Sequence, residues 1–102
     1  MKDRFEIEMQ PGQIVLIGYD YDLAFGVIKK INPSSYTVKV LQPLGVYIEN
    51  RWVRDGRFAL TTKVYNHTDR CMIVNDQILM GFPDQNLATQ LKQIQQDVQG
   101  TA

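Results

Sequence analysis

The chain has 102 residues, of which 44% are hydrophobic and 22% are charged, and its formal net charge is zero. This length suits one domain and leaves no room for a second independent core, and the moderate, mixed charge excludes a disordered chain. No stretch of about 18 or more apolar residues occurs, so the sequence predicts no membrane-spanning helix and no membrane partner.

The chain contains one cysteine, Cys71, and one histidine, His67. A single cysteine excludes an internal disulfide and is typical of a reducing compartment, and a zinc site would need at least two carboxylates besides these two residues. The charged amino-terminal stretch lacks the apolar core of a secretory signal. We therefore expect a cytoplasmic protein with no metal and no other cofactor.

The charges are distributed unevenly along the chain. Residues 29–63 carry seven Lys or Arg and two Asp or Glu, a net charge of +5, whereas residues 1–28 and 64–102 have net charges of −3 and −2. A basic central third between acidic ends indicates a surface for an acidic partner.

Short apolar runs rich in β-branched residues predict the first strands. Pro11-Gly12 precedes a strand at 13–17, residues 18–22 are expected to form a loop, and a second strand covers 23–31. Gly26 within this second strand indicates a bulge or a sharp bend. After a turn at 32–35, the alternation at 36–40 predicts a third strand.

The next segments are also predicted to be extended. Val46 to Val53 forms one such segment, which Arg54-Asp55-Gly56 would end as a tight turn. Residues 57–64 alternate between apolar and polar and predict another strand. A shorter strand follows at 70–74, and Asn75-Asp76 would turn it back into a hairpin with residues 78–80.

The carboxyl-terminal segment has the pattern of a helix. Asp84 suits the N-cap position and Gly100 suits a stop. One narrow apolar stripe repeats at helical spacing, formed by Leu87, Leu91, Ile94 and Val98. This stripe either docks on the rest of the domain or pairs with a second copy in a homodimer, because its spacing also fits two heptads.

The whole pattern predicts a mainly β fold. Its form is a small five- to six-stranded barrel or a strongly bent antiparallel sheet with a C-terminal α-helix. Residues 1–82 would form the small barrel domain, and residues 83–102 the amphipathic helix and tail, packed on the barrel or used for self-association.

Residues 11–40 resemble the Src-homology-3-like small barrels, particularly their KOW and Tudor-type members. Those domains share a Gly-x-x-Val-x-Val opening strand, matched here by residues 12–17, and a second strand written Gly-x-Val-x-x-Ile, matched by residues 26–31. Val38-Lys39-Val40 fits the strand that follows. The KOW signature has a further glycine where this chain has Leu23. The resemblance implies a binding domain for RNA, for ribosomal or polymerase surfaces, or for modified peptides.

The basic central third supplies the first candidate site. Its cations and neighbouring aromatic residues could together contact phosphates or an acidic protein surface. The expected partner-binding residues are Lys29, Lys30, Tyr47, Arg51, Trp52, Arg54 and Arg57. The alternative is that these cations are solvated positions scattered over half-buried strands.

Two smaller groups of residues are further candidates. A Tudor-like aromatic cage around a methylated cation could be formed by Tyr19, Tyr21, Phe25 and Trp52, unless Phe25 and Trp52 belong to the core. A catalytic or metal set of His67, Asp69 and Cys71 is weaker, because it has no second base and no paired carboxylates in a rigid element. We therefore assign no catalytic and no metal-binding residue.

The sequence thus predicts a non-enzymatic interaction module that binds an acidic protein surface through its basic central strands. Its small size suits a regulatory or inhibitory protein, such as a phage-type or viral accessory protein that binds host machinery. RNA or DNA binding through the same basic and aromatic face is the alternative, although the neutral overall charge favours a protein partner.

Overall fold

The computed structural model describes residues 1–19 and 22–100, which form one five-stranded antiparallel sheet with two helices. The strand order is β4-β3-β2-β1-β5, and the sheet is not closed into a barrel. The strands are β1 (Ile14–Tyr19), β2 (Asp22–Ile31), β3 (Tyr36–Ile48), β4 (Arg51–Tyr65) and β5 (Cys71–Ile73), and the helices are α1 (Asp76–Met80) and α2 (Gln85–Gly100). The predicted mainly β fold with a C-terminal helix is confirmed.

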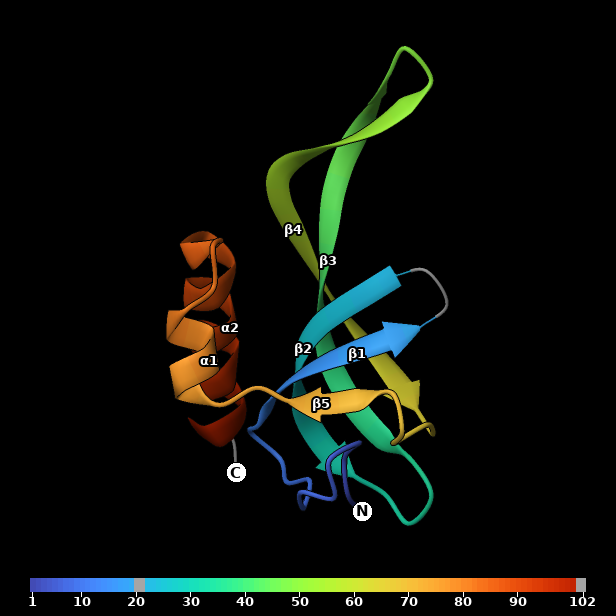
Figure 1. Ribbon diagram of the computed structural model, residues 1–102, viewed down its shortest axis with the longest axis vertical. Coiled ribbons are helices and arrows are strands. Elements are labelled where there is room, and N and C mark those ends of the chain that lie inside the picture. Colours follow the sequence, from blue (N-terminus) through green and yellow to red (C-terminus); the bar gives the residue numbers. More distant parts are fainter. Residues whose placement is uncertain (20–21, 101–102) are drawn as a thin grey trace.

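Apolar residues lie on both faces of the sheet and form two cores. The helices cover one face, and together with Ile14, Val27 and Leu41 they make the helix-side core (Figure 1). The opposite core contains Val15, Ile17, Ile28, Tyr36, Val38, Val40 and Cys71, with Met9 of the N-terminal segment packed against it. A sheet that is buried on both faces explains why β1 is an almost continuous apolar run.

Helix α2 begins where its cap was expected. The Asp84 carboxylate accepts a hydrogen bond of 3.0 Å from the Leu87 backbone N–H, which is the N-cap interaction. The apolar stripe of α2 is buried in the helix-side core, with Leu91 fully enclosed. Of the two predicted uses of this stripe, docking on the sheet is therefore the one observed, and the stripe already has a partner within its own chain.

Gly26 lies where β2 passes closest to β3. A Cβ atom at this position would stand 2.5 Å from the Lys39 carbonyl oxygen and 2.6 Å from a methyl group of Val38. Both contacts are too short for any side chain, so glycine is required there. The pairing register of β2 with β3 also shifts between Ile28 and Lys30, which adds a bulge to the same strand.

The tight turn predicted at 54–56 is wrong in position, and the segment predicted to be extended over 46–53 contains the turn instead. The tight turn of the β3–β4 hairpin lies at Glu49-Asn50, which both have positive φ (51° and 62°), the geometry of a two-residue hairpin turn. The segment 54–56 is instead part of β4. There the β3–β4 pairing shifts, and Gly56 with φ of 83° allows a bulge in the strand.

The predicted hairpin at 75–80 is also wrong, because residues 76–80 form helix α1. The side chain of Asn75 accepts a hydrogen bond of 2.8 Å from the Ile78 N–H and caps this helix. A helix here directs Leu79 into the helix-side core, where only 2% of it remains exposed.

The loop predicted at 18–22 is shorter than expected. Strand β1 includes residues 18–19 and β2 begins at Asp22, and residues 20–21 lie outside the described ranges.

The N-terminal segment covers one edge of the sheet. The Arg4 N–H donates to the Cys71 carbonyl at 2.8 Å, and the Asp3 carboxylate accepts from the Ile73 N–H at 3.0 Å. Strand β5 is therefore shielded on its outer side. At the other edge, β4 pairs only with β3 among the described strands, so its outer side is open.

Candidate functional site

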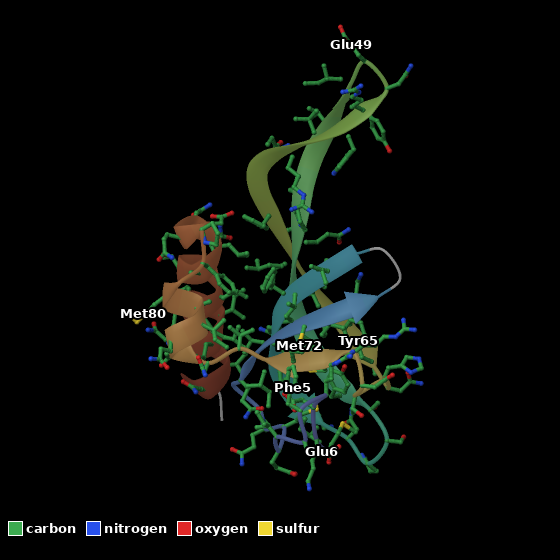
Figure 2. All side chains as sticks on the ribbon, viewed as in Figure 1. Phe5, Glu6, Glu49, Tyr65, Met72 and Met80 are labelled. Atoms are coloured by element: carbon green, nitrogen blue, oxygen red, sulfur yellow. The ribbon has the colours of Figure 1, made fainter. Side chains whose placement is uncertain are left out.

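The end of the β3–β4 hairpin projects beyond the rest of the sheet. Strand β2 pairs with β3 only as far as the Phe25–Leu41 pair, so from residue 42 onward β4 is the one described strand that pairs with β3. Figure 1 shows this part of the hairpin extending away from the sheet and the helices. We call residues 45–54 the arm; Glu49 lies at its tip (Figure 2).

The arm carries large apolar side chains with little cover. Tyr47 is 75% exposed, Ile48 54% and Trp52 51%, and Val46 and Val53 are exposed as well. Because cross-strand pairs share a face, the Tyr47–Trp52 pair occupies one face and the Val46–Val53 pair occupies the other. The rings of Tyr47 and Trp52 meet edge to face with their centroids 5.3 Å apart. Each face of the arm thus offers an apolar contact surface.

The arginines of this region differ in how far their charge is already used. Arg57, in the bulge at the base of the arm, is ion-paired with Asp55 at 2.5 Å. Hydrogen bonds from the Arg57 side chain and backbone hold the pKa of the Asp55 carboxyl below its ordinary value. Arg51 and Arg54 form no ion pair with any side chain that the structure describes. They are therefore the two arginines available to an acidic partner.

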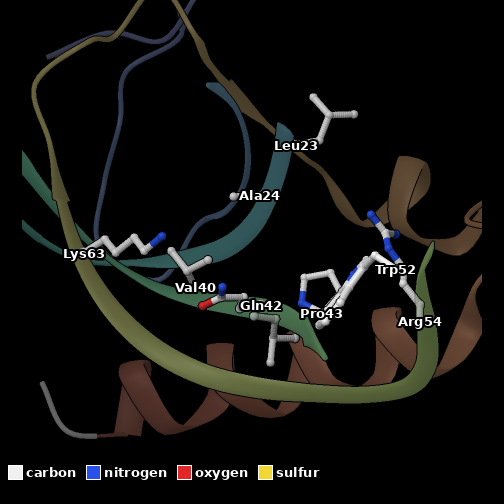
Figure 3. A pocket seen from close by; sticks show the side chains of 9 residues that line it. Leu23, Ala24, Val40, Gln42, Pro43, Trp52, Arg54 and Lys63 are labelled. Carbon is white, nitrogen blue, oxygen red and sulfur yellow. The ribbon is translucent and has the colours of Figure 1, made fainter. Parts of the chain in front are cut away.

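A pocket of about 280 Å³ lies at the base of the arm. Six of its nine lining residues are apolar, and the side chains of Lys63 and Arg54 stand at its two ends with Val40, Gln42 and Pro43 between them (Figure 3). Trp52 lies beside Arg54, and Leu23 lies at the rim. Thr61 pairs with the pocket residue Val40 from the neighbouring strand, and its hydroxyl is buried without a hydrogen-bond partner in the described structure.

The structure divides the predicted partner-binding residues into two groups. Tyr47, Arg51, Trp52 and Arg54 lie on the arm, and Arg57 lies at its base. Lys29 and Lys30 are exposed near the other end of the sheet, where β2 leads into the turn at 32–35. The arm and these two lysines therefore do not form one continuous surface.

The residues of the proposed aromatic cage have different surroundings. Phe25 packs against Phe82 in the helix-side core, with ring centroids 5.3 Å apart, whereas Trp52 pairs with Tyr47 on the arm. The Tyr19 side chain and the whole of Tyr21 lie outside what the structure describes. The cage therefore remains a prediction that the described residues do not support.

The His67, Asp69 and Cys71 set is divided between surface and core. His67 and Asp69 are exposed, and Cys71 is completely buried, where desolvation raises the pKa of its thiol to about 11. The backbone carbonyl of His67 accepts a hydrogen bond of 2.9 Å from the Tyr36 hydroxyl, which is a structural contact. Within the described ranges, no group of three or more His, Cys, Asp or Glu side chains is placed to hold a metal ion.

Sequence reasoning missed the pocket and half of the arm. Leu23, the adjacent pair Gln42 and Pro43, and Lys63 come from three separate parts of the chain and meet only through strand pairing. For the arm a signal existed: residues 46–53 are apolar at both even and odd positions, which places apolar side chains on both faces of an extended segment.

Comparison with known proteins finds no family model, no curated protein and no solved structure that matches this chain. The likeness to the Src-homology-3-like barrels therefore remains a prediction. No helix in the described part of the chain is long and apolar enough to cross a membrane.

Proposed function

We propose that this protein is a non-enzymatic interaction module that binds an acidic surface of a partner protein through its arm. The proposal rests on one observation: five large apolar side chains are exposed within eight residues of a hairpin that no other helix or strand of the described part of the chain covers. Exposed apolar patches of this kind are typical of protein–protein contact sites. Interface hot spots are also enriched in Trp, Tyr and Arg, and the arm contains all three.

The charge of the arm supports an acidic partner. Arg51 and Arg54 are exposed without an ion-pair partner in the described structure, and Glu49 at the tip is the only acidic residue in the arm. Rim charges of one sign steer association with a surface of the opposite sign. A regulatory or inhibitory role follows from such binding when the arm blocks a surface that the partner uses for something else.

Nucleic-acid binding through the same arm is the second candidate. A two-stranded ribbon fits the major groove, and arginines beside aromatic rings favour stacking with bases. The separation of Lys29 and Lys30 from the arm reduces the positive charge that any one nucleic-acid strand would meet. A protein partner is therefore the first choice.

A capture experiment with the intact protein tests the proposal. The bait is compared with the Tyr47→Ser/Ile48→Ser double variant and with Val64→Ser, a matched control on β4 outside the arm, where the valine is 65% exposed. Each bait is used with and without nuclease. We expect a partner that the wild type and Val64→Ser retain after nuclease treatment and that the double variant loses.

Two results would overturn this proposal. Retention by the double variant that equals wild-type retention would show that the arm is not the contact. Loss of the partner on nuclease treatment would instead assign the arm to nucleic acid, and a steep log-linear decrease of affinity with salt would accompany it.

A further inference from the structure

The pocket at the base of the arm has the size of a site for a small ligand or a few side chains. Its volume of about 280 Å³ lies near the lower end of the range for ligand pockets, about 300–1,000 Å³. Val40, Pro43 and Trp52 supply apolar surface, and Gln42 supplies an amide. A nucleotide or another drug-sized molecule is too large to be enclosed here, whereas a short aliphatic chain is of suitable size.

Among the side chains that the structure describes, neither cation of the pocket has a counter-charge. No ion pair joins Lys63 or Arg54 to another described side chain, and no acidic side chain is among the described residues that line the pocket. Two like charges beside low-dielectric walls focus a positive potential on the space between them. The pocket therefore favours an anionic ligand.

The positions of the cations determine the shape of that ligand. Lys63 pairs with Val38 and Arg54 pairs with Gly45, seven residues further along β3, which separates the two backbones by roughly 23 Å along the strand. Their side chains stand at opposite ends of the pocket (Figure 3). One small anion therefore contacts one cation, and only an elongated ligand with a charge at each end contacts both.

We infer that this pocket binds a ligand with two carboxylates joined by an apolar spacer. One carboxylate faces Arg54, the other faces Lys63, and the spacer lies on Val40, Pro43 and Trp52. An acidic segment of the partner protein is one source of this chemistry, and in that case the inference rests on the proposed function. A free aliphatic dicarboxylate is the other source.

Trp52 makes the test direct, because it is the only tryptophan of the chain and it lines the pocket. The purified full chain is titrated at constant ionic strength, and the fluorescence of Trp52 is recorded. The probes are octanedioate, octanoate as the matched monocarboxylate, and an acetylated and amidated Glu-Leu-Val-Leu-Glu peptide with its Gln-for-Glu counterpart. The same titrations are made with Arg54→Gln, Lys63→Gln and the control Lys30→Gln, which removes an exposed cation from the far end of β2.

We expect a saturable fluorescence change with a dicarboxylate probe, and at least about fivefold weaker binding of its matched control, because one charge-assisted contact is lost. Arg54→Gln and Lys63→Gln should each weaken the dicarboxylate by about the same factor, and Lys30→Gln should leave it unchanged. Tighter binding of the peptide identifies a protein segment as the source, and tighter binding of octanedioate identifies a free acid. Both outcomes support the inference.

The inference is overturned if each control probe binds as tightly as its dicarboxylate, if Lys30→Gln weakens binding as much as the pocket variants do, or if neither dicarboxylate probe gives a saturable change. These results are independent of partner capture, which the Tyr47→Ser/Ile48→Ser variant tests at the arm tip. Failure of the pocket and failure of the arm are therefore distinguishable.

Discussion

Asp3 joins the N-terminal segment to the sheet, and its removal should cost much of the stability of the domain. Only 4% of the residue is exposed. One carboxylate oxygen accepts from the N–H groups of Phe5 at 2.8 Å and Ile7 at 2.9 Å, and the other accepts from the N–H of Ile73 at 3.0 Å. A single side chain thus satisfies three backbone donors in two distant parts of the chain.

The magnitude follows from these three hydrogen bonds. A net value of about 1 kcal/mol for each gives a loss of about 3 kcal/mol for Asp3→Ala, because all three donors are left without their acceptor. Asp3→Asn retains the shape and one acceptor oxygen, so its loss should be about half as large. Small domains have only about 5–15 kcal/mol in total, so Asp3→Ala leaves a marginal fold.

Urea denaturation followed by circular dichroism measures this effect. With a slope of about 1.5 kcal/mol per molar urea, the midpoint of Asp3→Ala should fall by about 2 M. The control is Glu8→Gln, which removes an exposed carboxylate whose ion pair with the N-terminal amine is 3.3 Å long and should be worth less than about 1 kcal/mol. Equal midpoints for Asp3→Ala and Glu8→Gln would refute the reasoning.

Three further outcomes are expected. Thr61→Val removes a buried hydroxyl that has no partner in the described structure, so urea denaturation should show about 1 kcal/mol more stability. The control Thr62→Val, at an exposed position, should change the stability little. A loss of stability for Thr61→Val would reveal a hydrogen bond to that hydroxyl. Burial raises the pKa of Cys71 from 9.0 to about 11, so the unfolded thiol ionises first and stability should fall by on the order of 2 kcal/mol as the pH rises through this interval. Urea midpoints measured across it should show a smaller fall for Cys71→Ala, and an equal fall would contradict this cause. Replacing the six residues 47–52 with the two-residue turn Asn-Gly retains the pairing register of the remaining hairpin. A thermal melt should therefore show a change of less than about 1 kcal/mol in the free energy of unfolding, although partner capture is lost. A large destabilisation would mean that the arm supports the fold.

Local patterns were sufficient where one residue type determines one local geometry. The α2 helix could be predicted because Asp84 caps it and its four stripe residues recur at helical spacing, both properties of a short stretch of chain. Gly26 indicated a bulge or bend in β2, and the pairing register does shift two residues further on, but the close approach of Val38 and Lys39 that requires glycine there is a tertiary contact. Local patterns failed at the β3–β4 turn, because neither Glu49 nor Asn50 is glycine, and at α1, where the Asn75 side chain could equally have served a turn.

The tertiary structure alone decided which surface is available for binding. Whether Trp52 is core or contact depends on where β2 stops pairing, since β4 is the one described strand that pairs with β3 beyond Leu41. Whether Arg54 and Lys63 share a pocket depends on the register of two long strands. Composition placed the positive charge in the central third of the chain, but long-range pairing separated Lys29 and Lys30 from the arm, because strand register is a property of the whole sheet.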